Sequence, residues 1–153
     1  MANQLEKFGL RPYRKLDGTP LAGAQNRYTI KANYDQNIFQ GDLVIPVSTG
    51  NIERHVKNTS EAVVGVFNGC FFTDPTTQKP TFKNYSLDSN SGSTTTGISQ
   101  AMLDVGTSGT ATTFAIQAID ISQDPENSDV STSNANVLVR INNHFYRSGT
   151  GIA

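Results

Sequence analysis

Three side chains in this sequence have the chemistry of a nucleophile or a base: the thiol of Cys70 and the imidazoles of His55 and His144. Nucleophilic catalysis needs a nucleophile, a base within reach and a group that orients the base. Cys70 lies in the apolar run FNGCFF, where a thiol packs as a small hydrophobic group and its thiolate is disfavoured. The surroundings of both histidines are typical of a surface or an interface. We therefore expect no catalytic residue and no enzyme.

Metal chemistry would need a cluster of ligands, and the segment DISQDPENSD supplies four carboxylates within ten residues, at Asp120, Asp124, Glu126 and Asp129. Their spacing lacks the alternating aspartates and the glycine of an EF-hand calcium loop. The metal and phosphate motifs CxxC, HExxH, GxGxxG and GxxxxGK[ST] do not occur. We interpret the segment as a solvated acidic loop, and we predict neither a metal nor a cofactor.

Small uncharged polar side chains dominate the composition of the chain and limit which secondary structure could position a functional site. Asn, Ser and Thr make up 44 of the 153 residues, whereas charged residues make up only 16%. Such side chains favour turns and strand surfaces, and they compete with the backbone hydrogen bonds of a helix. Glycine and proline interrupt the chain at short spacing, with β-branched and aromatic runs between them. The sequence predicts an all-β fold, a small β-barrel or sandwich, with at most one short helix at 124–136.

Three segments give the strongest strand signals. The run EAVVGVFNGCFF at 61–72 is largely apolar and is broken by Gly65 and Gly69, which is typical of a buried or tightly bent strand, and we expect strands at 61–68 and 70–73. The segments TTFAIQAIDI at 112–121 and NVLVRINNHFY at 136–146 follow it. In the last segment, side-chain alternation places Val137, Val139 and Ile141 on one face.

Length and charge suggest how the chain is organised. At 153 residues and 16.5 kDa we expect an extended N-terminal arm at 1–25 and a β domain at 26–153. The polar loop at 88–97 could divide that domain into a barrel and a smaller outer lobe. Residues 1–31 hold six basic against two acidic residues, net +4, and the remainder is net −5. This asymmetry is either chance on a polar surface or a basic arm that docks on an acidic partner.

Two classes of partner are not expected. No apolar run approaches the roughly 18 residues of a membrane helix. The net charge of −1 argues against broad nucleic-acid binding. The leading residues MANQLEKFGL contain no apolar core of a signal peptide, so we expect synthesis in the cytoplasm.

The leading segment FGLRPYRKLDGTPLAGAQNRYTI at 8–30 resembles that of the head decoration, or cement, proteins of tailed phages. The matching residues are Phe8, Gly9, Leu10, Arg11, Pro12, Gly18, Pro20 and Tyr28. Two further blocks, IFQGDLV at 38–44 and VVGVFNGCFF at 63–72, are similar to the turn into the barrel and to its central strand in that family. The resemblance covers roughly the first 85 residues and is weaker beyond them.

The resemblance implies a virion structural protein that binds the outer surface of a phage capsid and stabilises it by bridging capsid subunits. It also implies that the chain is made in the host cytoplasm, forms a homotrimer and has the major capsid protein as its partner. Proline at position 12 favours an extended arm. The candidate capsid contacts are Phe8, Leu10, Arg11, Pro12, Tyr13, Arg14, Lys15 and Leu16.

Two alternatives stay open. Phe8, Leu10 and Tyr13 could belong to the core of the β domain instead of contacting a partner. The chain as a whole could be a β-rich module that binds carbohydrate or a receptor on a virion surface, since Thr, Asn, Ser and Tyr are abundant.

Overall fold

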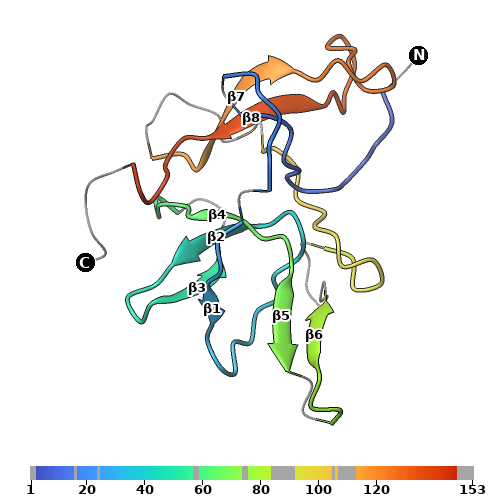
Figure 1. Cartoon of the computed structure of the whole chain (residues 1–153). Coiled ribbons are helices and arrows are strands. Elements are labelled where there is room, and N and C mark those ends of the chain that lie inside the picture. The colour runs from blue at the N-terminus through green and yellow to red at the C-terminus, as the bar shows by residue number, and fades with distance from the viewer. Residues whose placement is uncertain are drawn as a thin grey trace.

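A computed structural model describes residues 3–15, 17–23, 25–56, 59–73, 76–83, 92–104, 106 and 113–147. These residues form eight β-strands in three separate sheets, and they contain no α-helix (Figure 1). The predicted all-β class is confirmed. In the described residues the strands form no closed barrel, and their three sheets are compatible with the predicted sandwich.

The central sheet has the strand order β1-β3-β2-β4. Its strands are β1 (Thr29–Ile30), β2 (Leu43–Pro46), β3 (Asn51–Arg54) and β4 (Gly65–Val66). Strands β2 and β3 form an antiparallel hairpin, and β1 runs parallel to β3. The hairpin turns at Gly50, whose φ of 81° lies in the left-handed region that glycine adopts without strain.

The apolar core is small and centres on this sheet. Its buried members are Ile38, Phe39, Val44, Ile45, Ile52, Val63, Val64 and Phe67. Tyr34, Cys70 and Phe145 pack against it from the side and are partly buried. Sixteen other large apolar side chains are exposed among the described residues, so much of the apolar surface lies outside this core.

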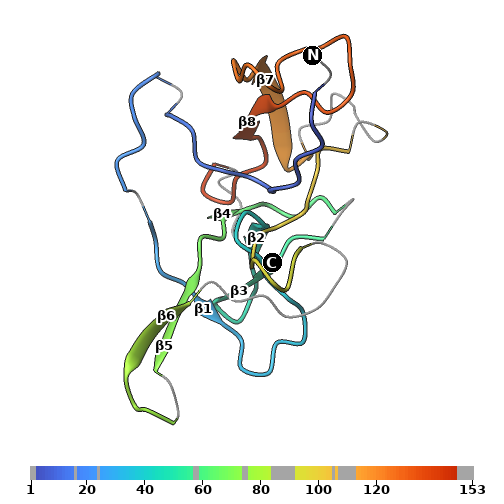
Figure 2. The ribbon, with the colours of Figure 1, turned by 90° about the vertical axis from the view of Figure 1, so that its right-hand side faces the viewer.

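Two ribbons extend from opposite ends of the central sheet. One is the hairpin of β5 (Cys70–Thr73) and β6 (Pro80–Lys83), and the other pairs β7 (Ile116–Ile121) with β8 (Val137–Ile141). Figures 1 and 2 show the central sheet between them in both views. The β7–β8 ribbon is tied to the central part at Val63, which accepts a hydrogen bond from the Phe145 amide and donates one to the Asn143 carbonyl.

The β7–β8 ribbon has one apolar and one polar face. Its register puts Ile116, Ala118, Ile121, Val137, Val139 and Ile141 on one face, with a bulge between Ala118 and Asp120. On the other face Arg140 Nε donates a hydrogen bond to Gln117 Oε1 at 2.8 Å. The predicted alternation of Val137, Val139 and Ile141 is therefore confirmed.

The short helix that the sequence allowed at 124–136 does not form. Residues 124–136 form turns, in which Asp124 and Asp129 accept hydrogen bonds from backbone N–H groups two residues ahead. The strand expected at 70–73 is β5, whereas the one expected at 61–68 is reduced to β4. Residues 88–91 of the loop at 88–97 lie outside the described residues, and its role as a divider stays a prediction.

Candidate functional site

The N-terminal arm begins on the 122–136 loop. Asn3 Nδ2 donates to the carbonyls of Asp129 and Ser133 at 2.7 and 3.1 Å, and the Asp129 amide donates back to Asn3 Oδ1 at 3.2 Å. The Gln4 amide donates to Oδ1 of Asn127 at 2.6 Å, and Asn127 is only 1% exposed. These bonds fix the start of the arm beside β7 and β8.

A second anchor lies at Gly9 and Gly41. The Leu10 amide donates to the Gly41 carbonyl at 2.9 Å, so the arm backbone touches the turn that leads into β2. A Cβ on Gly9 would lie 2.6 Å from the Ser99 Cβ, and one on Gly41 would lie 2.9 Å from the Phe8 carbonyl oxygen. Both glycines also have positive φ, 65° and 101°. Glycine at both positions is what allows this approach.

A buried carboxylate stabilises the turn beneath that anchor. Asp42, 4% exposed, accepts hydrogen bonds from the Phe39 amide at 2.9 Å and from Ser99 Oγ at 2.5 Å. Ser99 is fully buried, and its Oγ accepts a hydrogen bond from the Ala101 amide at 3.1 Å. Buried polar groups of this kind are stable only when they are hydrogen-bonded. The network joins the turn at 39–42 to the segment 97–101.

Beyond the anchor, the arm carries two arginines that stack on aromatic rings. The Arg11 guanidinium carbon lies 4.3 Å from the centroid of the Phe8 ring, and that of Arg14 lies 5.5 Å from the Tyr13 ring. Both arginines are exposed, and Tyr13 is 63% exposed. Stacking holds a guanidinium while its N–H groups stay available for a planar acceptor such as a carboxylate.

The arm then reverses in a tight hairpin. Arg14 and Pro20 form an isolated antiparallel β-bridge, and the Lys15 amide donates a hydrogen bond to the Thr19 carbonyl at 3.0 Å. Within the turn, Thr19 Oγ1 donates a hydrogen bond to Asp17 Oδ1 at 2.6 Å. That hydroxyl, together with the Thr19 amide, lowers the pKa of Asp17 below its ordinary value. The carboxylate is therefore ionised at neutral pH and caps the turn.

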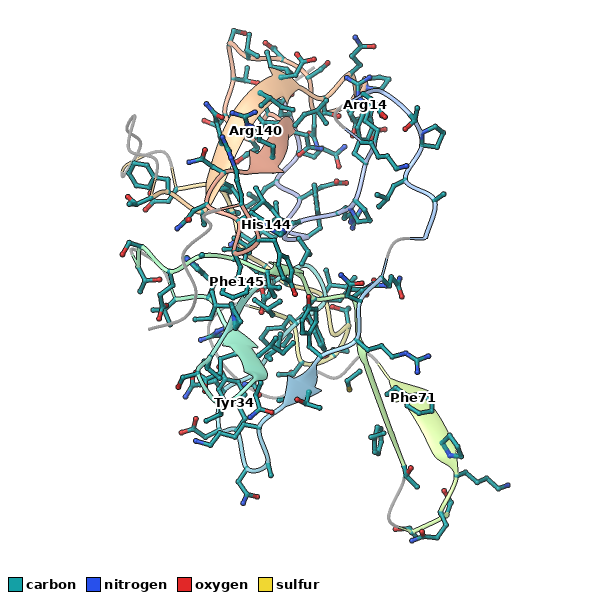
Figure 3. The ribbon with its side chains drawn as sticks, turned by 60° about the vertical axis from the view of Figure 1, so that its left-hand side comes forward. Arg14, Tyr34, Phe71, Arg140, His144 and Phe145 are labelled. Carbon is teal, nitrogen blue, oxygen red and sulfur yellow. The ribbon has the colours of Figure 1, made fainter. Side chains whose placement is uncertain are left out.

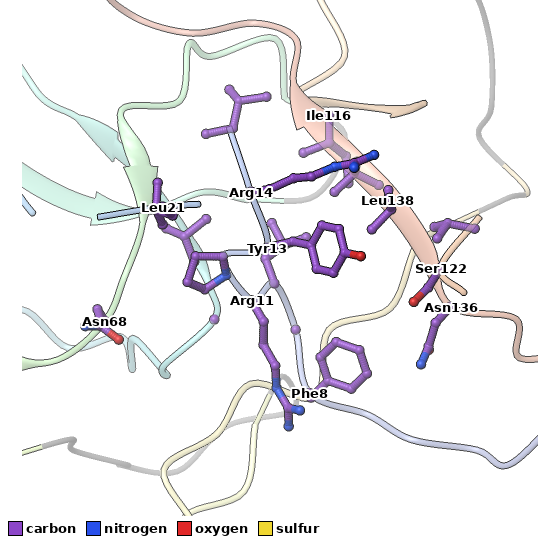
Figure 4. Close-up of a pocket in the computed structure, with 18 of the residues that line it drawn as sticks. Phe8, Arg11, Tyr13, Arg14, Leu21, Asn68, Ile116, Ser122, Asn136 and Leu138 are labelled. Atoms are coloured by element: carbon purple, nitrogen blue, oxygen red, sulfur yellow. The ribbon is translucent and has the colours of Figure 1, made fainter. Parts of the chain in front are cut away.

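Between the arm and the β7–β8 ribbon lies a cavity of about 790 Å³ that is open to solvent, which we call the arm groove (Figure 4). Tyr13 and Arg14 extend into it from the arm, opposite Ile116 and Leu138 of the ribbon. The apolar face of the ribbon and the exposed Leu21 also line it. Its size and mainly apolar lining are those of a site for a protein segment or a small ligand.

The structure places the predicted contact residues in different environments. Phe8 and Leu10 are half-buried at the Gly9 anchor, whereas Arg11, Pro12, Tyr13, Arg14 and Lys15 are exposed. Leu16 lies outside the described residues. Tyr13 is therefore not a core residue, and the alternative that Phe8, Leu10 and Tyr13 belong to the core of the β domain does not hold for Tyr13.

Several residues of this site were not found from the sequence. Asn3 and Gln4 bind the 122–136 loop, and Ser99 binds Asp42, across more than 50 residues in each case. The sequence signals that could have indicated this contact are the short motifs FGL and QGD, because their glycines, Gly9 and Gly41, lie where the two backbones touch.

The possible catalytic groups do not form a reactive arrangement in the described residues. Burial raises the pKa of the Cys70 thiol and lowers the pKa of His55, although Glu61 opposes the latter shift. Nδ1 of His144 accepts a hydrogen bond from the Tyr146 amide at 3.2 Å. No group of three or more His, Cys, Asp or Glu residues that could hold a metal ion occurs in this part of the chain.

Comparison with protein-family models, with curated proteins and with solved structures finds no match for this chain. The relation to the cement proteins therefore stays a prediction from the motifs. In the part of the chain that the structure describes, no helix is long and apolar enough to cross a membrane.

Proposed function

We propose that this chain is a non-enzymatic virion structural protein. It binds the outer surface of an assembled phage capsid through the N-terminal arm, bridges neighbouring capsid subunits and acts as a homotrimer. It is made in the host cytoplasm, and the major capsid protein is its partner. The observation that carries the proposal is the exposed arm, with Arg11 and Arg14 stacked on aromatic rings beside an open apolar groove.

The chemistry of the arm favours an acidic protein surface. Guanidinium groups form paired hydrogen bonds with carboxylates, and these bonds are stronger than those between neutral groups. Tyr13 and Leu21 add exposed apolar area next to the two charges. A surface that offers carboxylates around an apolar patch would bind both features at once.

Oligomerisation would multiply a modest contact. A trimer presents three arms, so the second and third contacts become intramolecular and avidity rises by about 10²–10⁴. The small core and the 16 exposed large apolar side chains support a chain that functions in an assembly.

Capsid binding tests the proposal. Particles assembled from the major capsid protein that the proposal names as partner are mixed with the purified chain, and co-sedimentation gives the affinity. We expect the double variant R11E/R14E to bind at least about tenfold more weakly, since each charge-assisted bond contributes about 1.5–3 kcal/mol.

The matched control is R27E/K31E, which makes the same change of charge at two exposed residues outside the stacked pairs. It should bind nearly as well as the wild type. Wild-type chain that does not sediment with the particles, or equal affinities for the two double variants, would contradict the arm as the contact.

A second candidate function is a carbohydrate- or receptor-binding module. It is favoured by a hollow of about 460 Å³ beside β3, lined by Tyr34 and by charged side chains that include Lys31, Asp35, Glu53 and Glu61. Tyr34 is held there because its hydroxyl accepts a hydrogen bond from the Arg54 amide at 3.1 Å. Specific glycan-array signals that disappear in Y34A would favour this function over capsid binding.

A further inference from the structure

Asn68 and Gly69 link the central sheet to the β5–β6 hairpin, the projecting ribbon that carries Phe71 (Figure 3). The link lies at the surface, since Asn68 is exposed although Phe67 before it is buried in the core. Water and dissolved base therefore reach the side chain of Asn68.

Gly69 has the backbone conformation of a residue without a side chain. Its φ is 148°, which residues with a Cβ rarely adopt. Among the 14 asparagines of the sequence, only Asn68 precedes a glycine. A glycine nitrogen has no neighbouring Cβ to shield it, so it can approach the side-chain amide of the preceding asparagine closely.

The two groups that would react are the amide nitrogen of Gly69 and the side-chain carbonyl of Asn68. Within the part of the chain that the structure describes, the Gly69 amide donates no backbone hydrogen bond, so no such bond holds its nitrogen away from reaction. Gln40 Nε2 donates a hydrogen bond to Asn68 Oδ1 at 3.1 Å. This bond draws electron density from Cγ and stabilises negative charge that develops on the oxygen.

The reaction of these groups is an intramolecular deamidation. Hydroxide removes the Gly69 amide proton, and the nitrogen attacks Cγ of Asn68 to close a five-membered succinimide ring. The Cγ–Nδ2 bond breaks, and ammonia leaves with a proton from water. A water molecule then opens the ring at either carbonyl, which gives aspartate or isoaspartate. The net change consumes one water, releases one ammonia and involves no oxidation or reduction.

Both products place a new carboxylate in the arm groove. Asn68 lines this groove, on the opposite side of the view from Leu138 (Figure 4). The charged side chains of the lining are three basic and two acidic residues: Arg11, Arg14, Lys15, Glu6 and Asp124. A carboxylate is ionised at neutral pH, so the net charge of the lining falls from +1 to zero. The groove then attracts an acidic partner less strongly.

We propose that Asn68–Gly69 is a self-modifying site, at which conversion to aspartate or isoaspartate lowers the affinity of the arm groove for an acidic surface as the protein ages. The reaction needs only water and hydroxide. The modification does not depend on the capsid, whereas its effect on binding rests on the proposed function.

The first test follows the asparagines in the native full chain at neutral and at mildly alkaline pH. Peptide mass spectrometry measures the fraction of acid at each position. Asn33 is the internal control, because it is exposed but the amide of Tyr34 after it donates a hydrogen bond to the Lys31 carbonyl at 3.2 Å. We expect Asn68 to convert at least about tenfold faster than Asn33, and faster at the higher pH.

The products identify the route. Ring opening gives aspartate and isoaspartate peptides of equal mass that chromatography separates, whereas direct hydrolysis of the side-chain amide gives aspartate alone. Equal rates at Asn68 and Asn33 would overturn the inference, as would aspartate as the sole product.

The second test blocks the reaction with N68Q. The amide is kept, but attack on the longer side chain must close a less favourable six-membered ring. Isoelectric focusing of the intact chain should show the added negative charge in the wild type and not in N68Q over the same time. N33Q is the matched control and should acquire charge like the wild type. Acid that accumulates in N68Q at the wild-type rate would place the reaction at another residue and overturn the inference.

The third test measures the effect of the new charge on the groove. N68D carries the charge of the product and N68Q stays neutral, and circular dichroism verifies that both variants are folded. We expect N68D to bind capsid particles roughly two- to fivefold more weakly than N68Q, with a smaller difference in added salt. Equal affinities would overturn the effect on binding.

The outcomes separate this inference from the proposed function. Chain that converts at Asn68 but does not bind particles would leave the modification site in place and overturn the proposed function. Chain that binds particles but keeps the Asn68 amide would do the reverse.

Discussion

Asp42 and Ser99 form a buried hydrogen bond of 2.5 Å between side chains 57 residues apart. Asp42 is 4% exposed and Ser99 is fully buried, so both partners are withdrawn from bulk water. The bond holds the turn before β2 against the segment that carries Ser99. The arm passes over the same place at Gly9, so the pair also supports the base of the candidate docking site.

Removing the Ser99 hydroxyl should destabilise the fold. S99A leaves Asp42 Oδ1 buried without this donor, at a cost of about 1–3 kcal/mol in the free energy of unfolding. Urea denaturation followed by circular dichroism measures it. T19A is the matched control, because it removes a hydroxyl 2.6 Å from the exposed carboxylate of Asp17 and should destabilise the fold much less than S99A. Equal losses would show that burial is not the cause.

Glycine at position 9 should be required for the arm to lie against the β domain. G9A combines backbone strain with a collision at Ser99, for a loss of roughly 2–6 kcal/mol in the free energy of unfolding. Gly18 also has a positive φ, but there is open space around a Cβ at this position. G18A should therefore lower the free energy of unfolding through backbone strain alone, by roughly 1–3 kcal/mol. Thermal melting compares the two variants. A G9A loss no larger than that of G18A would refute the close contact.

The geometry of the arginine side chains should affect capsid binding beyond their charge. R11K/R14K keeps both charges but loses the planar fork and the stacking on Phe8 and Tyr13. We expect its affinity for particles to fall between those of the wild type and R11E/R14E. Added salt should weaken binding by the wild type, because exposed charges are screened. If R11K/R14K binds particles as tightly as the wild type, the charge of the two side chains alone accounts for their contribution to affinity, and the argument from guanidinium geometry is contradicted.

Asp129 should titrate at lower pH than an ordinary aspartate. Hydrogen bonds from Ser131 Oγ and the Ser131 amide favour its ionised form and lower its pKa. The stabilisation is present above the unfolded-state pKa and is lost as pH falls through the lowered, folded-state pKa. S131A should therefore raise the pKa of Asp129 and destabilise the fold at neutral pH, with the difference vanishing in acid.

Nuclear magnetic resonance titration of the side-chain carboxyl carbons measures that shift. Asp17 is the internal reference, since its own donor is Thr19 and its pKa should not change in S131A. An Asp129 pKa that is the same in S131A and the wild type would contradict the assigned cause.

Local sequence signals predicted the class of fold and part of the site. Alternation predicted the apolar face of β8, because side chains on a strand point to opposite sides whatever else the chain does. The short helix allowed at 124–136 does not form, and Asp124 and Asp129 accept hydrogen bonds from nearby backbone N–H groups in turns instead. The strand predicted at 70–73 coincides with β5, whereas the one predicted at 61–68 is reduced to β4, because the segment changes sheets at Gly69.

The amino-acid sequence by itself determined the β class, the basic leading segment and the acidic later half, since composition and side-chain alternation act over a few residues. Only the tertiary structure decided that Asn3 binds the 122–136 loop, that Ser99 satisfies Asp42, and that Tyr13 faces an open groove instead of the core. Contacts between residues so far apart depend on how the whole chain packs, and no local pattern encodes them.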